Sequence, residues 1–126
     1  MYKLEITHRE DYSFSVNSGA GEFLIDAKKK GAGPLDILLA GLASCIGVYV
    51  RKYSEGAKLD LKNFKVNIEA ELTKDSPLRF QEIKVCLDLK GSQMDERRKN
   101  AILDFIKNCP AHNTLKNNPS VEFKIC

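Results

Sequence analysis

The chain has 126 residues, a length that suits one domain and leaves little room for a second. Its hydrophobic fraction of 43% and charged fraction of 29% are those of an ordinary globular protein. The net charge of +3 is too small to indicate a nucleic-acid or membrane-surface protein. We therefore expect a single domain over residues 1–126, and we expect the basic clusters at 28–30 and 97–99 to lie in solvated loops or helix ends.

No segment is predicted to cross a membrane. The longest apolar run, residues 37–43, is far shorter than the roughly 20 residues that a spanning helix needs. The N-terminus has no apolar run after a basic start, so no secretory signal is expected. These features predict a cytoplasmic protein without a membrane partner, in a compartment where structural disulfides are rare.

Short strands are predicted in the first 26 residues. Apolar and polar residues alternate over residues 2–7 and again over residues 12–16, and residues 22–26 form a third candidate strand. A turn is expected at residues 17–21, where Ser, Asn and Gly gather. A polar loop containing glycine follows, over residues 27–33.

A long helix is predicted to begin at Pro34, because proline is favoured in the first turn, where its missing N–H is not needed. Gly56 is its expected end. The residues that follow helical spacing on its apolar face are Leu35, Leu38, Leu39, Leu42, Cys45, Ile46, Tyr49 and Tyr53. Small residues between them suit close packing at the centre of the fold.

Two further strands are predicted over residues 64–72 and 82–89, each with one apolar and one polar face, and a turn at Gly91 and Ser92 follows them. A second helix is expected from about Met94 to Asn108, and Pro110 opens a short extra turn. Alternating apolar residues over 121–125 predict a closing strand. The order βββ-α-ββ-α-β, which lacks alternating βαβ units, indicates the α+β class.

The four cysteines show no CxxC pair and no zinc-ligand spacing, so no metal or other cofactor is expected. Cys45 lies on the apolar helix face, where periodicity alone favours a buried core cysteine. Cys109 precedes Pro110 at a helix start, where backbone N–H groups favour a thiolate; a helix-terminal cysteine without a role is the alternative. His112 is either a base or, as we favour, a surface polar residue.

The other two cysteines are expected to be bystanders. Cys86 lies on the polar face of its strand, between Lys84 and Asp88. Cys126 is the last residue of the chain. Neither position indicates a chemical role.

Two segments resemble the two cysteine motifs of the OsmC/Ohr family, the osmotically inducible and organic-hydroperoxide-resistance proteins. Residues 33–45, Gly-Pro-Leu-Asp-Ile-Leu-Leu-Ala-Gly-Leu-Ala-Ser-Cys, resemble the first motif. Residues 109–115, Cys-Pro-Ala-His-Asn-Thr-Leu, resemble the second. The resemblance covers essentially the whole chain, in length, element order and the distance between the cysteines.

The resemblance implies an intertwined homodimer in which two central helices pack against antiparallel sheets from both subunits. It implies a thiol-dependent peroxidase that reduces organic hydroperoxides. Cys45 is then the peroxidatic cysteine, and Cys109 resolves its sulfenic acid as a disulfide. A dithiol or lipoyl-type reductant is the implied partner. An apolar pocket around Cys45 suits an apolar peroxide, but a buried thiolate also needs a nearby cation.

The chain departs from the family pattern at the residues that activate the thiol. Peroxidase members usually carry Glu directly after the helix-starting proline, whereas this chain has Leu35, with Asp36 one place later. They also carry an activating Arg in the N-terminal strand region, and residues 10–50 contain no Arg. Arg9, Arg51 and the lysines at 28–30 are the cations left to supply charge. We therefore expect peroxide reduction to be slow.

Two other functions compete with the peroxidase. The first is a non-catalytic dimer that binds a small apolar ligand in the interface pocket, which the missing Glu and Arg favour. The second is a small RNA-binding domain that uses the basic clusters. It lacks a GxxG clamp and exposed strand aromatics for base stacking, so no nucleic-acid partner is expected.

Overall fold

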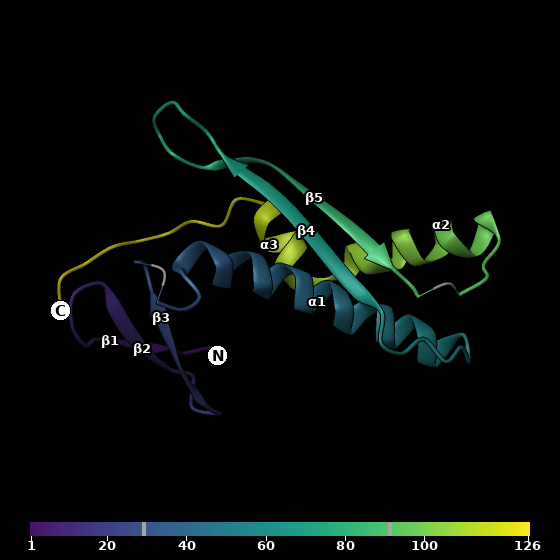
Figure 1. The fold of residues 1–126 in the computed structure, drawn as a ribbon, viewed down its shortest axis with the longest axis horizontal. Helices are drawn as coiled ribbons and strands as arrows, with labels where there is room; N and C mark the ends of the chain where they lie inside the picture. Colours follow the sequence, from purple (N-terminus) through teal and green to yellow (C-terminus); the bar gives the residue numbers. More distant parts are fainter. Residues whose placement is uncertain (29, 91) are drawn as a thin grey trace. The chain divides into compact units, whose positions relative to one another are not determined.

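The computed structural model describes residues 1–28, 30–90 and 92–126. Its elements, in chain order, are β1 (Glu5–His8), β2 (Ser13–Asn17), β3 (Glu22–Asp26), α1 (Pro34–Gly56), β4 (Lys65–Leu72), β5 (Phe80–Asp88), α2 (Glu96–Phe105), the 3-10 turn η1 (Ile106–Asn108) and α3 (Pro110–Lys116) (Figure 1). The predicted α+β class is confirmed. Lys29 of the first basic cluster and Gly91 of the predicted turn lie outside the described residues.

The chain forms two compact units, Met1–Ala40 and Gly41–Cys126, and the boundary falls inside α1. The first unit contains a three-stranded antiparallel sheet of order β1-β2-β3. Ile6, Val16 and Phe23 lie opposite one another across the three strands and so share one face. Val16 on the central strand is almost fully buried. The three strands predicted for this region are confirmed.

Helix α1 begins at Pro34 and ends at Gly56, as the sequence predicts. Its buried side chains recur at every fourth position, as Leu42, Ile46, Val50 and Ser54, so they form one stripe along the helix. The predicted apolar face is less covered near the start of the helix, where Leu35 and Leu38 are more than 40% exposed.

Helix α1 is apolar over a longer stretch than the uninterrupted apolar run at residues 37–43, on which the sequence prediction rested. Its 23 residues include an 18-residue window of mean hydropathy 1.5, long and apolar enough to cross a membrane by length and composition alone. Core helices of soluble proteins meet the same criterion. The buried stripe of α1 packs on protein side chains within the second unit, which is the arrangement of a core helix.

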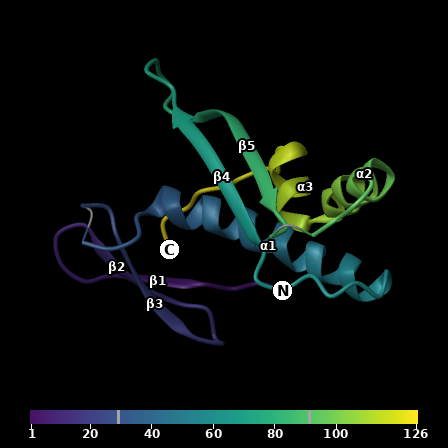
Figure 2. The ribbon, with the colours of Figure 1, turned by 45° about the vertical axis from the view of Figure 1, so that its right-hand side comes forward.

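The β4–β5 hairpin of the second unit lies along α1 (Figures 1 and 2). Its antiparallel register places Ile68 opposite Val85 and Val66 opposite Leu87, so the apolar side chains of both strands share one face. Charged pairs such as Glu69 and Lys84 lie opposite each other on the other face. The predicted apolar and polar faces are therefore confirmed, except that an irregularity after Ala70 leaves Leu72 exposed.

Two buried clusters form the core of the second unit. One contains Leu42, Ile46 and Cys109, and the other contains Val50, Leu61 and Ile102. Partly buried side chains from both strands of the hairpin and from α1 pack against these clusters. Those around the first cluster are Cys45, Tyr49, Val66, Ile68, Ile83, Leu87, Ile106 and Ala111. Both cysteines of the two motifs therefore lie in or against a single cluster.

The second predicted helix has different ends in the structure. Asp95 is its N-cap and accepts the N–H of Arg98 at 2.8 Å, so α2 begins at Glu96 rather than Met94. The chain then tightens into η1. The short turn predicted at Pro110 is confirmed as the helix α3.

The predicted closing strand is wrong for the single chain. Residues 118–126 run on from α3 without regular structure (Figure 1). Val121, Phe123 and Ile125 are 68%, 91% and 102% exposed. A strand exists only beside a hydrogen-bonded neighbour, and apolar alternation in a sequence does not say whether the same chain provides one.

We predict that Ile102→Ala lowers the free energy of unfolding by about 2–5 kcal/mol, because it leaves a cavity at a fully buried position. Leu103→Ala is the matched control, since Leu103 is the next residue of α2 and is 49% exposed. It should change the free energy by less than about 0.5 kcal/mol. Urea denaturation measures both, and equal losses would contradict the packing described here.

Candidate functional site

Cys45 lies in the second unit, in the middle of α1, beside the buried stripe of that helix. Its side chain is partly buried and packs against the cluster of Leu42, Ile46 and Cys109. The expectation of a core position is confirmed in part, because the residue is neither fully buried nor freely exposed. The thiol therefore combines an apolar setting with some access to its surroundings.

Cys109 is completely buried and is the N-cap residue of α3. Its Sγ accepts the backbone N–H of His112 at 3.5 Å. Its own N–H donates to the carbonyl oxygen of Ile106 at 3.1 Å. Pro110 occupies the first turn, where its missing N–H leaves no backbone donor unsatisfied. This turn fixes the thiol between η1 and α3.

The Cys45 thiol packs against the buried cluster that contains Cys109. Burial raises the pKa of Cys109, and the neighbouring Cys45 side chain raises it further. The backbone N–H groups of His112 and Ala111 lower that pKa but do not outweigh burial. The helix start therefore favours a thiolate at Cys109, as the sequence predicts, but burial has the larger and opposite effect.

The side chains around the two thiols are apolar and come from several elements. They include Leu42 and Ile46 of α1, Val66 of β4 and Ile106 of η1. An apolar environment of this kind favours an apolar reactant over a strongly hydrated one. The arrangement brings together one partly accessible thiol and one fully buried thiol.

His112 is not the surface polar residue that we favoured. It is half-buried, and its ring nitrogen Nδ1 is buried without a hydrogen-bond partner among the described residues. The sequence places a histidine three positions after Cys109, but the burial of one ring nitrogen depends on how α3 packs. Sequence analysis therefore could not identify this buried ring nitrogen.

The remaining cysteines lie where the sequence placed them. Cys86 and Cys126 are exposed. Cys86 is opposite Asn67 on the polar face of the hairpin. Neither belongs to the cluster that holds Cys45 and Cys109.

Asp36 has a structural task at the start of α1. Its Oδ2 accepts the backbone N–H of Gly33 at 2.9 Å, the back-hydrogen bond of a capping box. A carboxylate with this partner holds the entry of the helix. Leu35, one place earlier, is exposed and has no polar side-chain atom with which to orient a cation.

Nearby polar groups contact the candidate cations Arg9, Lys28 and Arg51. Arg9 Nε donates to Ser15 Oγ at 3.0 Å, and Lys28 Nζ lies 3.3 Å from Asp11. Arg51 donates to the carbonyl oxygen of Leu61 and pairs with Glu55. None of these contacts is with a cysteine.

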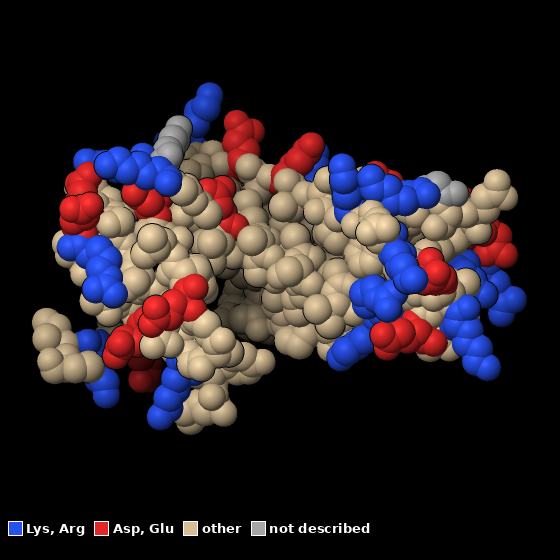
Figure 3. Space-filling model, turned by 60° about the horizontal axis from the view of Figure 1, so that its bottom comes forward, with Lys and Arg blue, Asp and Glu red and all other residues tan. Residues whose placement is uncertain are grey.

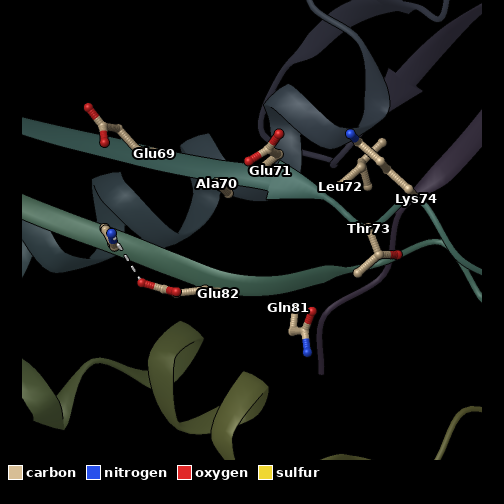
Figure 4. A pocket seen from close by; sticks show the side chains of 9 residues that line it. Glu69, Ala70, Glu71, Leu72, Thr73, Lys74, Gln81 and Glu82 are labelled. Carbon is tan, nitrogen blue, oxygen red and sulfur yellow. Dashed lines mark ion pairs between the residues drawn. The ribbon is translucent and has the colours of Figure 1, made fainter.

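The β4–β5 hairpin of the second unit carries a polar hollow, unlike the apolar surroundings of the two thiols. A hollow of about 680 Å³ at the free end of the hairpin is lined by polar residues such as Glu69, Glu71 and Gln81 (Figure 4). Glu82 on its rim pairs with Lys84 at 3.3 Å. Within residues 1–28, 30–90 and 92–126, no three His, Cys, Asp or Glu side chains are placed to hold a metal ion.

The charged side chains do not form a continuous basic surface on the face shown in Figure 3, where Lys and Arg are interspersed with Asp and Glu. Several are in local ion pairs, such as Lys99 with Glu96 and Lys107 with Asp104. A protein that binds nucleic acid through phosphate contacts gathers positive charge on one face. This face does not have that distribution.

Comparisons with known proteins find relatives of this chain in both sequence and fold. Residues 27–124 match the family model OsmC, described as OsmC-like protein. The hydroperoxide reductase of Mycoplasma genitalium is 30% identical over 132 residues, which cover 98% of this chain and 93% of that protein. The hydroperoxide reductase of Mycoplasma pneumoniae is 28% identical, covering 91% and 86%. The crystal structure of an OsmC like protein from Mycoplasma pneumoniae superposes with a TM-score of 0.80 at 25% identity, covering 94% and 89%.

We predict that the free energy of unfolding falls more steeply above pH 9 in the wild type than in Cys109→Ala. The ordinary cysteine pKa is 9.0, and that of Cys109 is raised in the folded protein. Above pH 9 the unfolded chain therefore releases a proton that the folded protein still holds, so stability present below pH 9 is lost as pH rises toward the raised pKa. Urea denaturation at pH 7 to 10.5 measures the slopes. Cys86→Ala, which removes an exposed thiol, should keep the wild-type slope.

Proposed function

The chain belongs to the OsmC/Ohr family, and from this membership we propose that it is a thiol-dependent peroxidase for organic hydroperoxides. Cys45 is the peroxidatic cysteine in this proposal, and Cys109 is the resolving cysteine. The peroxide-related role of the family and the names of the two mycoplasma relatives support the reaction type.

The observation that carries the proposal is that Cys45 and Cys109 lie together in one apolar cluster. The different exposure of the two thiols supports the assignment of roles. The thiolate that attacks the peroxide has to be reached by it. Cys45 is partly accessible, whereas Cys109 is fully buried, and burial raises the pKa of Cys109.

The two-cysteine reaction balances without a cofactor. The Cys45 thiolate attacks one peroxide oxygen, the O–O bond breaks, and the alkoxide leaves and takes up a proton as the alcohol. Cys45 becomes a sulfenic acid. Cys109 then attacks the Cys45 sulfur, and a disulfide and water form. A dithiol, such as a lipoyl group, returns both cysteines to thiols by thiol–disulfide exchange.

The apolar side chains around the thiols support an organic peroxide as the substrate. Leu42, Ile46 and Val66 offer contacts to an alkyl group and no hydrogen bonds to a small hydrated peroxide. We propose that the reaction takes place in the cytoplasm, where dithiol reductants are available.

We also propose that turnover is slow compared with members that carry the full Arg and Glu pair. Leu35 stands in place of the Glu, and Asp36 is committed to its cap. Arg9 and Arg51 are committed to Ser15 and to Leu61 and Glu55. No described contact then gives the Cys45 sulfur a planar cation as its partner.

A non-catalytic dimer that binds an apolar ligand is the competing function, and the same engaged cations favour it. The two functions differ in one chemical product. A peroxidase forms a sulfenic acid at Cys45 when it meets an alkyl hydroperoxide, and a ligand-binding protein does not.

We propose that the two units act as one domain within an intertwined homodimer. The apolar residues that alternate along 121–125 have no neighbouring strand in the single chain, and Tyr2 and Leu4 at the other terminus are also exposed. An exposed apolar strand with free N–H and C=O groups is a site for pairing with a second chain. A second copy provides the partner that the predicted closing strand needs.

We predict that one equivalent of cumene hydroperoxide converts the reduced protein to a form with a 45–109 disulfide, detected by mass spectrometry of non-reduced peptides. In Cys109→Ser, Cys45 should accumulate as a dimedone-reactive sulfenic acid, because no resolving thiol is present. Cys45→Ser should form neither product. Cys86→Ser, the exposed-thiol control, should react as the wild type does. If no variant forms a sulfenic acid at Cys45, the result contradicts the peroxidase and supports the ligand-binding dimer.

We predict that Phe123→Asp shifts the protein from a dimer to a 14.1 kDa monomer, because the apolar side of the terminal segment then carries a charge. Lys124→Asp, on the alternate side of the same segment, should remain dimeric. Light scattering at micromolar concentration measures the mass. A wild-type protein that is monomeric at that concentration would count against the dimer.

A further inference from the structure

The buried ring nitrogen of His112 has no task in the two-step reaction described so far. Among the described residues, Nδ1 of His112 is the buried side-chain nitrogen or oxygen that has no hydrogen-bond partner. Buried polar groups are nearly always paired, because leaving one unpaired costs the full loss of its hydration. An unpaired buried nitrogen on a residue whose backbone contacts the Cys109 thiol therefore calls for an explanation.

The local backbone explains why Nδ1 is left unpaired. Cys109 is the N-cap residue of α3, and His112 is three residues later. In a capping box, the side chain at that later position accepts the N–H of the N-cap residue. Here the N–H of Cys109 already donates to Ile106 in the preceding turn. One half of the capping box is formed, from His112 N–H to Cys109 Sγ, and the other half is blocked.

The same geometry keeps the imidazole in the turn that holds the Cys109 thiol. Residues three positions apart on a helix lie on the same side. The backbone of His112 contacts Sγ directly at 3.5 Å. Since Cys109 is completely buried, bulk water does not reach its thiol in this structure.

We propose that Nδ1 of His112 accepts the thiol proton of Cys109 during the resolving step. This inference rests on the proposed function. Once Cys45 is a sulfenic acid, the buried Cys109 thiol must lose its proton to become a nucleophile. His112 is the unpaired acceptor available in the same turn.

The proton and electrons balance in this step. Nδ1 takes the proton from Cys109, and the Cys109 thiolate attacks the Cys45 sulfur. The S–O bond of the sulfenic acid breaks, and the leaving hydroxide takes the proton back from the imidazolium as water. The Cys109 sulfur supplies the electron pair of the new S–S bond, and the hydroxide leaves with the electron pair of the S–O bond, so the products are one disulfide, one water and neutral His112.

The test is a single-turnover experiment on the full-length reduced protein with one equivalent of cumene hydroperoxide. Rapid quenching with dimedone follows the sulfenic acid, and non-reduced peptide mass spectrometry follows the disulfide. In His112→Ala, sulfenic acid should form at the wild-type rate, while the disulfide should form about 100-fold more slowly, the usual effect of losing a general base. Added imidazole should restore much of that rate by occupying the space left by the ring.

Asn113→Ala is the matched control, because Asn113 is the next residue of α3 and is exposed. It should resolve at the wild-type rate. His112→Leu separates chemistry from stability, since it removes a buried unpaired nitrogen and fills the space. It should resolve slowly while its midpoint of thermal unfolding stays equal to or above the wild-type value. His112→Asn serves as the second variant if the alanine variant does not fold.

The outcomes discriminate between the inference and the function on which it rests. Wild-type resolving rates in both His112→Ala and His112→Asn would overturn the base role and leave the two-cysteine function intact. Slow resolution that imidazole does not restore would assign His112 a positioning role and also overturn the base role. Failure of the wild type itself to form sulfenic acid would overturn the function and the inference together.

Discussion

Cys45 and Cys109 come together because α1 and the start of α3 meet in one apolar cluster. Leu42 and Ile46 hold the α1 side of this contact, and the η1 turn holds the other by fixing the Cys109 backbone. The contact is therefore a product of core packing. Residues that never touch a peroxide decide whether the two sulfurs meet.

Burial acts most strongly on Cys109. It raises the pKa of this thiol and so favours its protonated form. In the proposed two-cysteine reaction, Cys109 has to lose this proton inside an apolar cluster before it can attack. The proposed role of His112 follows from that demand, because its Nδ1 is buried and unpaired among the described residues.

Sequence patterns were sufficient where local chemistry decides the structure. Pro34 and Gly56 gave the bounds of α1, because proline and glycine preferences at helix ends do not depend on tertiary contacts. Two cysteine motifs predicted the pair that the core brings together. The patterns failed where a distant or second partner decides. The alternation over 121–125 predicts a strand, but the single chain forms none there, because it supplies no neighbouring strand. The orphaned nitrogen of His112 and the capping task of Asp36 became visible only with coordinates.

Asp36 also shows that a carboxylate one position later in the sequence does not replace the Glu of the motif. A shift of one position turns a helical side chain by about 100°. The carboxylate at that position faces back to Gly33 and closes the helix entry. Leu35, one place earlier, has no polar side-chain atom to offer. The helix start of this chain therefore uses its one carboxylate as a cap, while the packing of α1 against α3 brings the two cysteines into one cluster.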